Sequence, residues 1–191
     1  MEGNQAIGEG YYSQGLNTYK VNMVMHRENR ERLIVRMKNV VKDVVGHVAF
    51  FQGGETPMKY DTDTEFLFIQ ESFFHYLFGV KEPGCSGMID FNTGKSYLFI
   101  PKLPQEYSVW MGKIQPPEYF QKLYLVDQVL FIEDIKETMQ KIETKQIHLI
   151  SGCNKDSGSN FTEATFKGIE NFGLIKSNLY HELVECRVFF F

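Results

Sequence analysis

The segment Gly87–Ile100, GMIDFNTGKSYLFI, decides the fold because it holds two apolar stretches separated by a tight turn. Gly94 supplies the positive φ angle that a turn at Asn92-Thr93-Gly94 needs, which is typical of a β-hairpin. An earlier apolar run, His47–Phe51, ends at Gly53-Gly54 and fits a buried strand that enters a turn. The first half of the chain therefore predicts neighbouring strands of one sheet.

Working outward from this hairpin, the apolar spacing predicts further strands and helices. Leu33, Met37, Val40, Val41 and Val44 recur at three and four residues, which indicates an amphipathic helix over 25–45. The other expected elements are strand-like segments at 66–68 and 73–78, a helix that starts at 116–118, a strand at 126–132, a helix at 133–143, a strand at 146–150, a helix at 162–170 capped by Thr162, and a short helix at 179–185.

Strands and helices alternate in the second half, after a first half rich in hairpins. This order predicts an α/β fold with a mixed β-sheet flanked by helices. The length of 191 residues suits one domain. We expect a lead-in at 1–20 and one domain at 21–191.

Composition excludes several classes of function. The net charge of −4 gives no electrostatic reason to bind nucleic acid or an anionic membrane. No apolar run approaches the roughly 20 residues of a membrane span, and the acidic start at 1–5 lacks the apolar core of a signal peptide. The cysteines, Cys85, Cys153 and Cys186, lie far apart and predict free thiols in a reducing compartment, so we expect a cytoplasmic protein.

Two short motifs suggest chemistry, and each has a plainer interpretation. His181-Glu182-Leu183-Val184-Glu185 stops one residue short of the zinc motif His-Glu-x-x-His, and His181 and Glu185 could share a metal. A solvated helix face is favoured, because no third ligand lies nearby in the sequence. The segment 152–159 lacks the Gly-Lys-Ser/Thr ending of a phosphate-binding loop, so a surface loop between a strand and a helix is favoured there.

Two aromatic side chains also need an interpretation. His75 stands within an aromatic run and is expected to be a satisfied core residue. Trp110 is the single tryptophan and follows a stretch marked by Pro101 and Pro104. It could equally pack on its own domain or serve as a recognition group on a loop. Taken alone, the residues give an α/β domain without a complete catalytic set.

A series of short segments occurs along the chain in a characteristic order: 51–55 (FQGGE), 60–64 (YDTDT), 68–80 (FIQESFFHYLFGV), 82–85 (EPGC), 93–96 (TGKS), 98–104 (LFIPKLP), 110–114 (WMGKI), 162–166 (TEATF) and 184–189 (VECRVF). Through these segments most of the chain, residues 10 to 189, resembles the N-terminal domain of the prolidase, aminopeptidase P and creatinase family, above all that of eukaryotic-type prolidases.

The resemblance implies a supporting role. In this family the domain precedes a "pita-bread" catalytic domain, which binds two manganese ions through two Asp, one His and two Glu and cleaves dipeptides that end in proline. None of these ligands maps onto this chain, so the resemblance implies no catalytic residue and no metal or other cofactor here. It further implies a homodimer in which a loop of one subunit borders the active site of the other, with Trp110 at the mouth for short Xaa-Pro peptides.

Two departures from the family pattern stand out. Ile69 occupies a position where related enzymes usually carry Arg, and Phe189–Phe191 replaces the polar start of the catalytic domain's first helix. Exposed aromatics at a chain end suggest either a fragment of a longer enzyme or a short protein with a docking tail. The alternatives are a stand-alone, non-catalytic protein- or peptide-binding module, as occurs in a histone-chaperone subunit, and an enzyme that uses His181 and Glu185.

Overall fold

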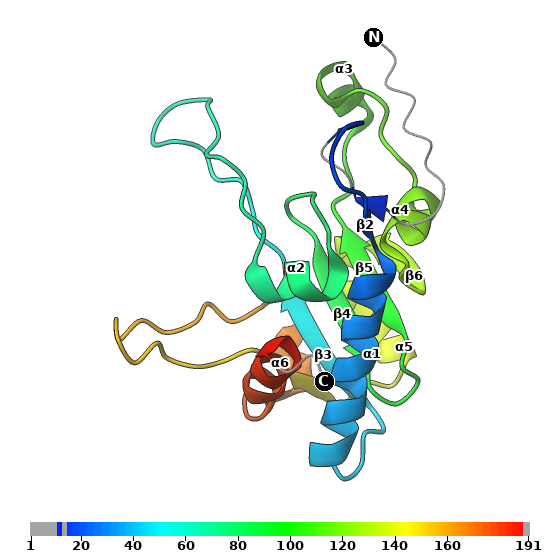
Figure 1. The fold of residues 1–191 in the computed structure, drawn as a ribbon, viewed down its shortest axis with the longest axis vertical. Helices are drawn as coiled ribbons and strands as arrows, with labels where there is room; N and C mark the ends of the chain where they lie inside the picture. Colours follow the sequence, from blue (N-terminus) through cyan, green and yellow to red (C-terminus); the bar gives the residue numbers. More distant parts are fainter. Residues whose placement is uncertain (1–10, 13–14, 189–191) are drawn as a thin grey trace.

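The computed structural model describes residues 11–12 and 15–188, apart from the side chains of Tyr12, Trp110, Met111 and Val188 (Figure 1). A six-stranded sheet in the order β6-β5-β4-β3-β7-β8 forms the centre. β3 pairs antiparallel with β4, and β4 with β5, whereas the pairs β5–β6, β3–β7 and β7–β8 are parallel. The predicted α/β fold with a mixed sheet is therefore confirmed. Its strands are β3 (His47–Gln52), β4 (Ser86–Asp90), β5 (Ser96–Ile100), β6 (Gln128–Phe131), β7 (Gln146–His148) and β8 (Gly173–Ile175).

The expected hairpin joins β4 to β5. Asp90 closes its turn, since one carboxylate oxygen accepts from the Asn92 backbone N–H at 2.9 Å and the other accepts from the Thr93 hydroxyl. Gly94 has a φ of 76°, which explains why glycine stands there. The turn chemistry visible in the sequence thus fixes the register of the two strands.

Helices cover both faces of the sheet. On one face α1 (Val24–Val40), α2 (Ser72–Phe78) and α6 (Leu179–Val188) bury Leu33, Phe74 and Leu183 against Phe51 and Ile89. The sheet side chains alternate, so Phe50 and Met88 enter a second core on the opposite face. That core is closed by η2 (Ile132–Asp134), α5 (Ile135–Lys141) and η3 (Ile169–Asn171).

The remaining elements are short. A two-stranded sheet of β1 (Tyr11–Tyr12) and β2 (Val21–Asn22) precedes α1, and η1 (Gln105–Tyr107), α3 (Ser108–Met111) and α4 (Pro117–Tyr124) connect β5 to β6. Proline stands in the first turn of α4, as predicted. Among the helices that the structure describes, none is both long and apolar enough to span a membrane.

The prediction of a strand at 73–78 is wrong, because this segment forms α2. Glu71 caps the helix by accepting from the backbone N–H groups of Phe73 and Phe74, and Gly79 ends it in the left-handed conformation. His75 is therefore an exposed helix residue rather than a core residue. The segment 66–68 is a loop and not a strand.

The helix predicted at 162–170 is also absent from the described structure. The chain has no regular secondary structure from 161 to 166 and turns at Lys167 and Gly168 into η3, so that Ala164 and Phe166 pack on the second core. Thr162 consequently caps no helix. The strand β8, which follows, was not predicted from its three residues, and α1 ends at Val40 because Val41 is already extended.

Candidate functional site

The segment that carries Trp110 leaves β5 and returns to the domain at α4. It forms η1 and α3, and α3 ends where Gly112, at a φ of 75°, donates its N–H to the Ser108 carbonyl. Val109 is 79% exposed and Tyr107 is half-exposed, so this segment presents apolar side chains to solvent. Figure 1 shows α3 above the sheet, away from the helices that cover it. The side chain of Trp110 is outside the described atoms, and its role at a substrate mouth stays a prediction.

A second segment, residues 55–69, also projects from the domain (Figure 1). Tyr60, Leu67 and Ile69 are among its most exposed side chains, and Ile69 is 77% exposed. The residue that replaces the family's usual Arg therefore lies on the surface of this segment. Its neighbour Gln70 holds the base of the segment through hydrogen bonds to backbone groups on both sides.

The two residues of the metal hypothesis lie on α6. His181 is exposed, and Glu185 lies 3.9 Å from Arg36 of α1. Glu182 between them is buried and forms an ion pair with Arg36 at 2.7 Å. In the described parts of the chain no three His, Cys, Asp or Glu side chains are grouped so that they could hold a metal ion. His181 and Glu185 thus have no third ligand there.

The loop 152–159 is closed by its own polar groups. The Asn154 side chain accepts from the backbone N–H groups of Asp156 and Ser157, and Cys153 pairs with Asn160. The predicted surface loop is confirmed, although a segment without regular secondary structure rather than a helix follows it.

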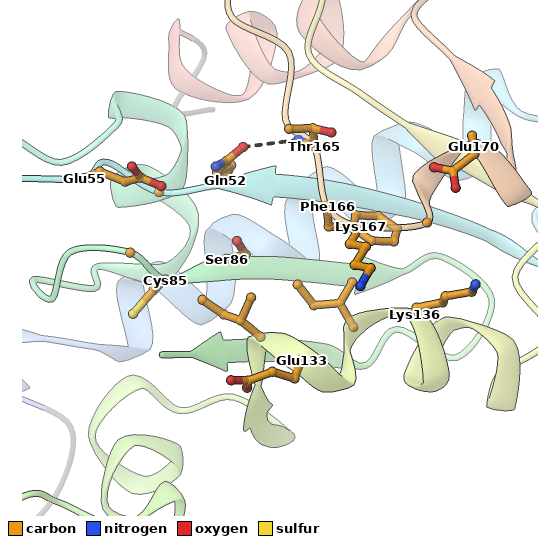
Figure 2. Close-up of a pocket in the computed structure, with 15 residues that line it drawn as sticks. Gln52, Glu55, Cys85, Ser86, Glu133, Lys136, Thr165, Phe166, Lys167 and Glu170 are labelled. Carbon is orange, nitrogen blue, oxygen red and sulfur yellow. Dashed lines mark hydrogen bonds between the residues drawn. The ribbon is translucent and has the colours of Figure 1, made fainter. Parts of the chain in front are cut away.

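A cavity of about 590 Å³ opens at the end of the second core, where β3 stops and β4 begins (Figure 2). Gln52 and Ser86 are paired directly across these strands, so their side chains leave the same face of the sheet. On the same face, two residues further into each strand, lie the apolar side chains of Phe50 and Met88. The sheet therefore changes from an apolar to a polar floor where the cavity starts.

The cavity lies between two covering segments. One wall is η2 with the start of α5, and the other is the segment 165–170, which turns into η3. The Thr165 backbone N–H donates to the Gln52 side-chain oxygen at 3.1 Å, and this bond ties the second wall to the floor. The segment 162–170, which was predicted to be a helix, thus forms one wall of this cavity.

Cys85 contributes a thiol to the cavity wall. Burial raises its pKa to about 12, and the charge of Glu82 adds to this effect. A thiol with a raised pKa stays protonated at neutral pH and is a poor nucleophile. Cys85 is therefore not expected to act as a nucleophile in this cavity.

The prediction from sequence did not identify this cavity. A signal was present, because Gln52 and Ser86 are polar at positions that continue the apolar alternation of Phe50 and Met88. Neither residue forms a motif in the sequence, and the facing walls come from residues 132–136 and 165–170, which lie at least 46 positions further along the chain.

Comparison with known proteins identifies the domain. The family model described as "Aminopeptidase P, N-terminal domain" matches residues 26–150. The Xaa-Pro dipeptidases of Pongo abelii and Homo sapiens are 45% and 44% identical over 175 residues, which is 92% of this chain and 36% of each relative. The chain thus spans little more than a third of the length of these curated relatives.

Solved structures show the same fold. A Bacillus anthracis protein assigned to the aminopeptidases P superimposes with a TM-score of 0.67 at 22% identity, covering 88% of this chain and 41% of the other. Aminopeptidase PepP of Pseudomonas aeruginosa superimposes with a TM-score of 0.58 at 20% identity, covering 72% and 30%. With the family model matching most of the chain, this protein belongs to the family of aminopeptidase P N-terminal domains, and its sequence is that of the N-terminal domain of a protein similar to Xaa-Pro dipeptidase.

Proposed function

We propose that this chain acts as the non-catalytic N-terminal domain of a manganese-dependent Xaa-Pro dipeptidase, where it supports a homodimer and borders the active site of the partner subunit. One observation carries the proposal: 45% identity extends over 92% of this chain but falls on 36% of a dipeptidase. Such a match is expected for one domain of a longer enzyme.

The chemistry of manganese supports placing catalysis elsewhere. Manganese prefers oxygen ligands from carboxylates, together with imidazole, and a catalytic site needs several of them at one point. The described residues offer no group of three such ligands, so they do not fit the metal. We therefore assign no catalytic residue to this chain, and in this proposal its cofactor is bound by residues of a separate catalytic domain.

Exposed apolar side chains support a role in dimerisation. Leu16, Tyr19, Leu67, Ile69 and Val109 are each at least 77% exposed, and they lie on the lead-in, the segment 55–69 and the α3 segment. Large apolar side chains in such numbers on projecting segments are typical of protein interfaces. We propose that a second subunit covers part of this surface and that Trp110 then lies at the mouth of that subunit's site for short Xaa-Pro peptides.

A domain exchange tests the proposal. Residues 1–188 of this chain replace the matching N-terminal region of the human Xaa-Pro dipeptidase, and hydrolysis of Gly-Pro is measured with manganese. We expect the chimera to be dimeric and active, and the 191-residue chain alone to be inactive. Robust Gly-Pro hydrolysis by the chain alone would overturn the non-catalytic role.

A second candidate is a stand-alone, non-catalytic module that binds proteins or peptides. The cavity of about 590 Å³ favours it, because this volume suits a small ligand and the site needs no second domain. This role predicts a stable partner other than a second copy of the chain. For either function a cytoplasmic location is proposed, in keeping with the three free cysteines.

A further inference from the structure

We propose that the cavity between β3, β4, α5 and the segment 165–170 binds a small zwitterion with an apolar side chain, of the class of free amino acids and short peptides with free ends. The ligand's ammonium group would face Glu55 and Glu133, and its carboxylate would face Lys136 and Lys167. This inference does not depend on the proposed dipeptidase function.

Charges of opposite sign occupy opposite ends of the cavity. Figure 2 shows Glu55 and Glu133 on the side of Cys85, and Lys136 and Lys167 on the other side with Glu170 beside them. One end thus carries two negative charges, and the other carries two positive charges and one negative charge. A ligand with one charge of each sign complements this distribution, whereas a simple anion or cation satisfies only one end.

The charged groups are free to bind. Among the described residues, none of these five side chains forms an ion pair or a side-chain hydrogen bond, although Arg36, Glu163 and Lys176 elsewhere on the surface do. Charge-assisted hydrogen bonds to a ligand would therefore cost no bond within the domain.

The floor adds two polar groups to the lining. Ser86 is largely buried, and its hydroxyl makes no hydrogen bond within the described part of the chain. The Gln52 side chain is half-buried and uses its oxygen to hold Thr165, which leaves its amide nitrogen as a donor toward the cavity. Both groups are therefore available to a ligand that enters the cavity.

Apolar side chains define the rest of the ligand. Ile132, Ile135 and Phe166 line the cavity together with the charged groups. A volume of about 590 Å³ lies within the usual range for small-molecule sites. An amino acid or a short peptide with an aliphatic side chain matches both the volume and this lining, whereas a folded partner does not.

Nuclear magnetic resonance titration of the 191-residue chain tests the proposal with four probes: leucine, Gly-Leu, N-acetyl-Gly-Leu and Gly-Leu-amide. We expect the amide signals of Gln52 and Ser86 to shift with leucine or Gly-Leu, and the better binder of the two identifies the source of the ligand. Blocking either end of the better binder should weaken the Kd about tenfold, as expected for the loss of one charged hydrogen-bonding group.

Exposed charges allow variants that do not disturb the core. Lys136→Gln with Lys167→Gln should weaken Gly-Leu about tenfold but leave Gly-Leu-amide unchanged, while Glu55→Gln with Glu133→Gln should abolish the preference for a free amino group. Lys122→Gln, at an exposed lysine of α4 outside this cavity, is the matched control and should bind as the parent chain does.

The proposal is overturned if Gln52 and Ser86 do not shift with leucine or Gly-Leu at up to about 10 mM. It is equally overturned if the blocked probes bind as well as the free ones, or if the lysine and glutamate variants bind like Lys122→Gln. Failure of the dipeptidase chimera would leave these results unaffected, so the two proposals are tested separately.

Discussion

The side-chain oxygen of Gln70 accepts a hydrogen bond from the backbone N–H of Gly54 at 2.6 Å, which closes the base of the projecting segment 55–69. The amide nitrogen of Gln70 donates to the Val80 carbonyl at 3.0 Å, so one side chain joins the end of β3 to the end of α2. A Cβ atom on Gly54 would lie 2.7 Å from the Ile69 carbonyl oxygen, which explains the glycine. Gly54 and Gln70, which belong to the segments that carry the family resemblance, therefore have a structural role.

Gln70→Ala should destabilise the domain by about 2 kcal/mol, because several backbone groups lose their partner at once. Urea unfolding followed by circular dichroism measures the change. Ile69→Ala, next in sequence but 77% exposed, is the control and should change the free energy of unfolding by less than about 0.5 kcal/mol. Equal effects of the two variants would contradict the role given to Gln70.

The contact between α1 and α6 depends on an ion pair. Glu182 is 6% exposed and accepts from Arg36 at 2.7 Å. Arg36→Ala should cost about 2 kcal/mol, because it leaves a buried carboxylate without its partner, while Glu182→Gln should cost less. A double-mutant cycle in urea unfolding measures the coupling, and a coupling near zero would show that the pair does not fix α6.

Stability should fall in mild acid because of the pair His47 and His148. The two rings lie 3.0 Å apart between nitrogen atoms, and His148 is buried against Phe91. Burial, with the charge of His47 adding to it, lowers the pKa of His148 to about 4. The unfolded chain therefore takes up a proton at a higher pH than the folded chain does.

The lowered pKa of His148 makes the folded domain less stable as the pH falls. The contribution to stability is complete above a pH of about 6.5, the pKa of an unperturbed histidine, and is lost as the pH falls to about 4. We expect a loss of about 3 kcal/mol over this window, measured by urea unfolding at several pH values. His148→Gln should reduce the slope but not remove it, because burial also lowers the pKa of His26. An unchanged slope would contradict the assignment.

Much of the fold was predictable because its signals are local. The hairpin at Asn92-Thr93-Gly94 and the helix α4 after Pro116 depend on turn and proline chemistry that acts within a few residues. The strands β3, β4, β5, β6 and β7 and the mixed character of the sheet followed from apolar runs and their alternation with helices, whereas β8 was not predicted.

The failures share a physical cause, which is that tertiary contacts override the local pattern. The run Phe73–Phe78 has the aromatic composition of a strand, but the cap at Glu71 and the burial of Phe74 and Leu77 make it helical. The segment 162–170 does not form the predicted helix because Phe166 packs against the second core, whose residues lie far away in sequence. The cavity was missed for the same reason, since residues at 52, 86, 133 and 167 meet only in the folded chain.

Thiol chemistry distinguishes the three cysteines. Cys153 is exposed, whereas Cys85 and Cys186 are buried, and burial raises the pKa of both buried thiols. Ellman's reagent at neutral pH should therefore modify one thiol quickly in the folded chain and the other two only after unfolding in urea. Cys153→Ser should abolish the fast reaction. Rapid modification of all three thiols in the folded protein would contradict the described burial.

The proposed role of Trp110 at the substrate mouth of the partner subunit can be tested in the chimera. In the dimeric chimera with the human catalytic region, Trp110→Ala should raise the KM for Gly-Pro about tenfold, because an aromatic wall of the substrate mouth is lost. Val109→Ala, on the same segment, is the control and should leave the KM within about twofold. A Trp110→Ala chimera with parental kinetics would remove Trp110 from the substrate mouth.

The size of the native protein tests the central claim most directly. An antibody raised against this domain is used on a denaturing immunoblot of lysate from the cells that produce it. Because the chain matches 36% of the length of its dipeptidase relatives, the account predicts a band at more than twice 22.2 kDa. A single band at 22.2 kDa would contradict the role as one domain of a dipeptidase and would favour the stand-alone binding module.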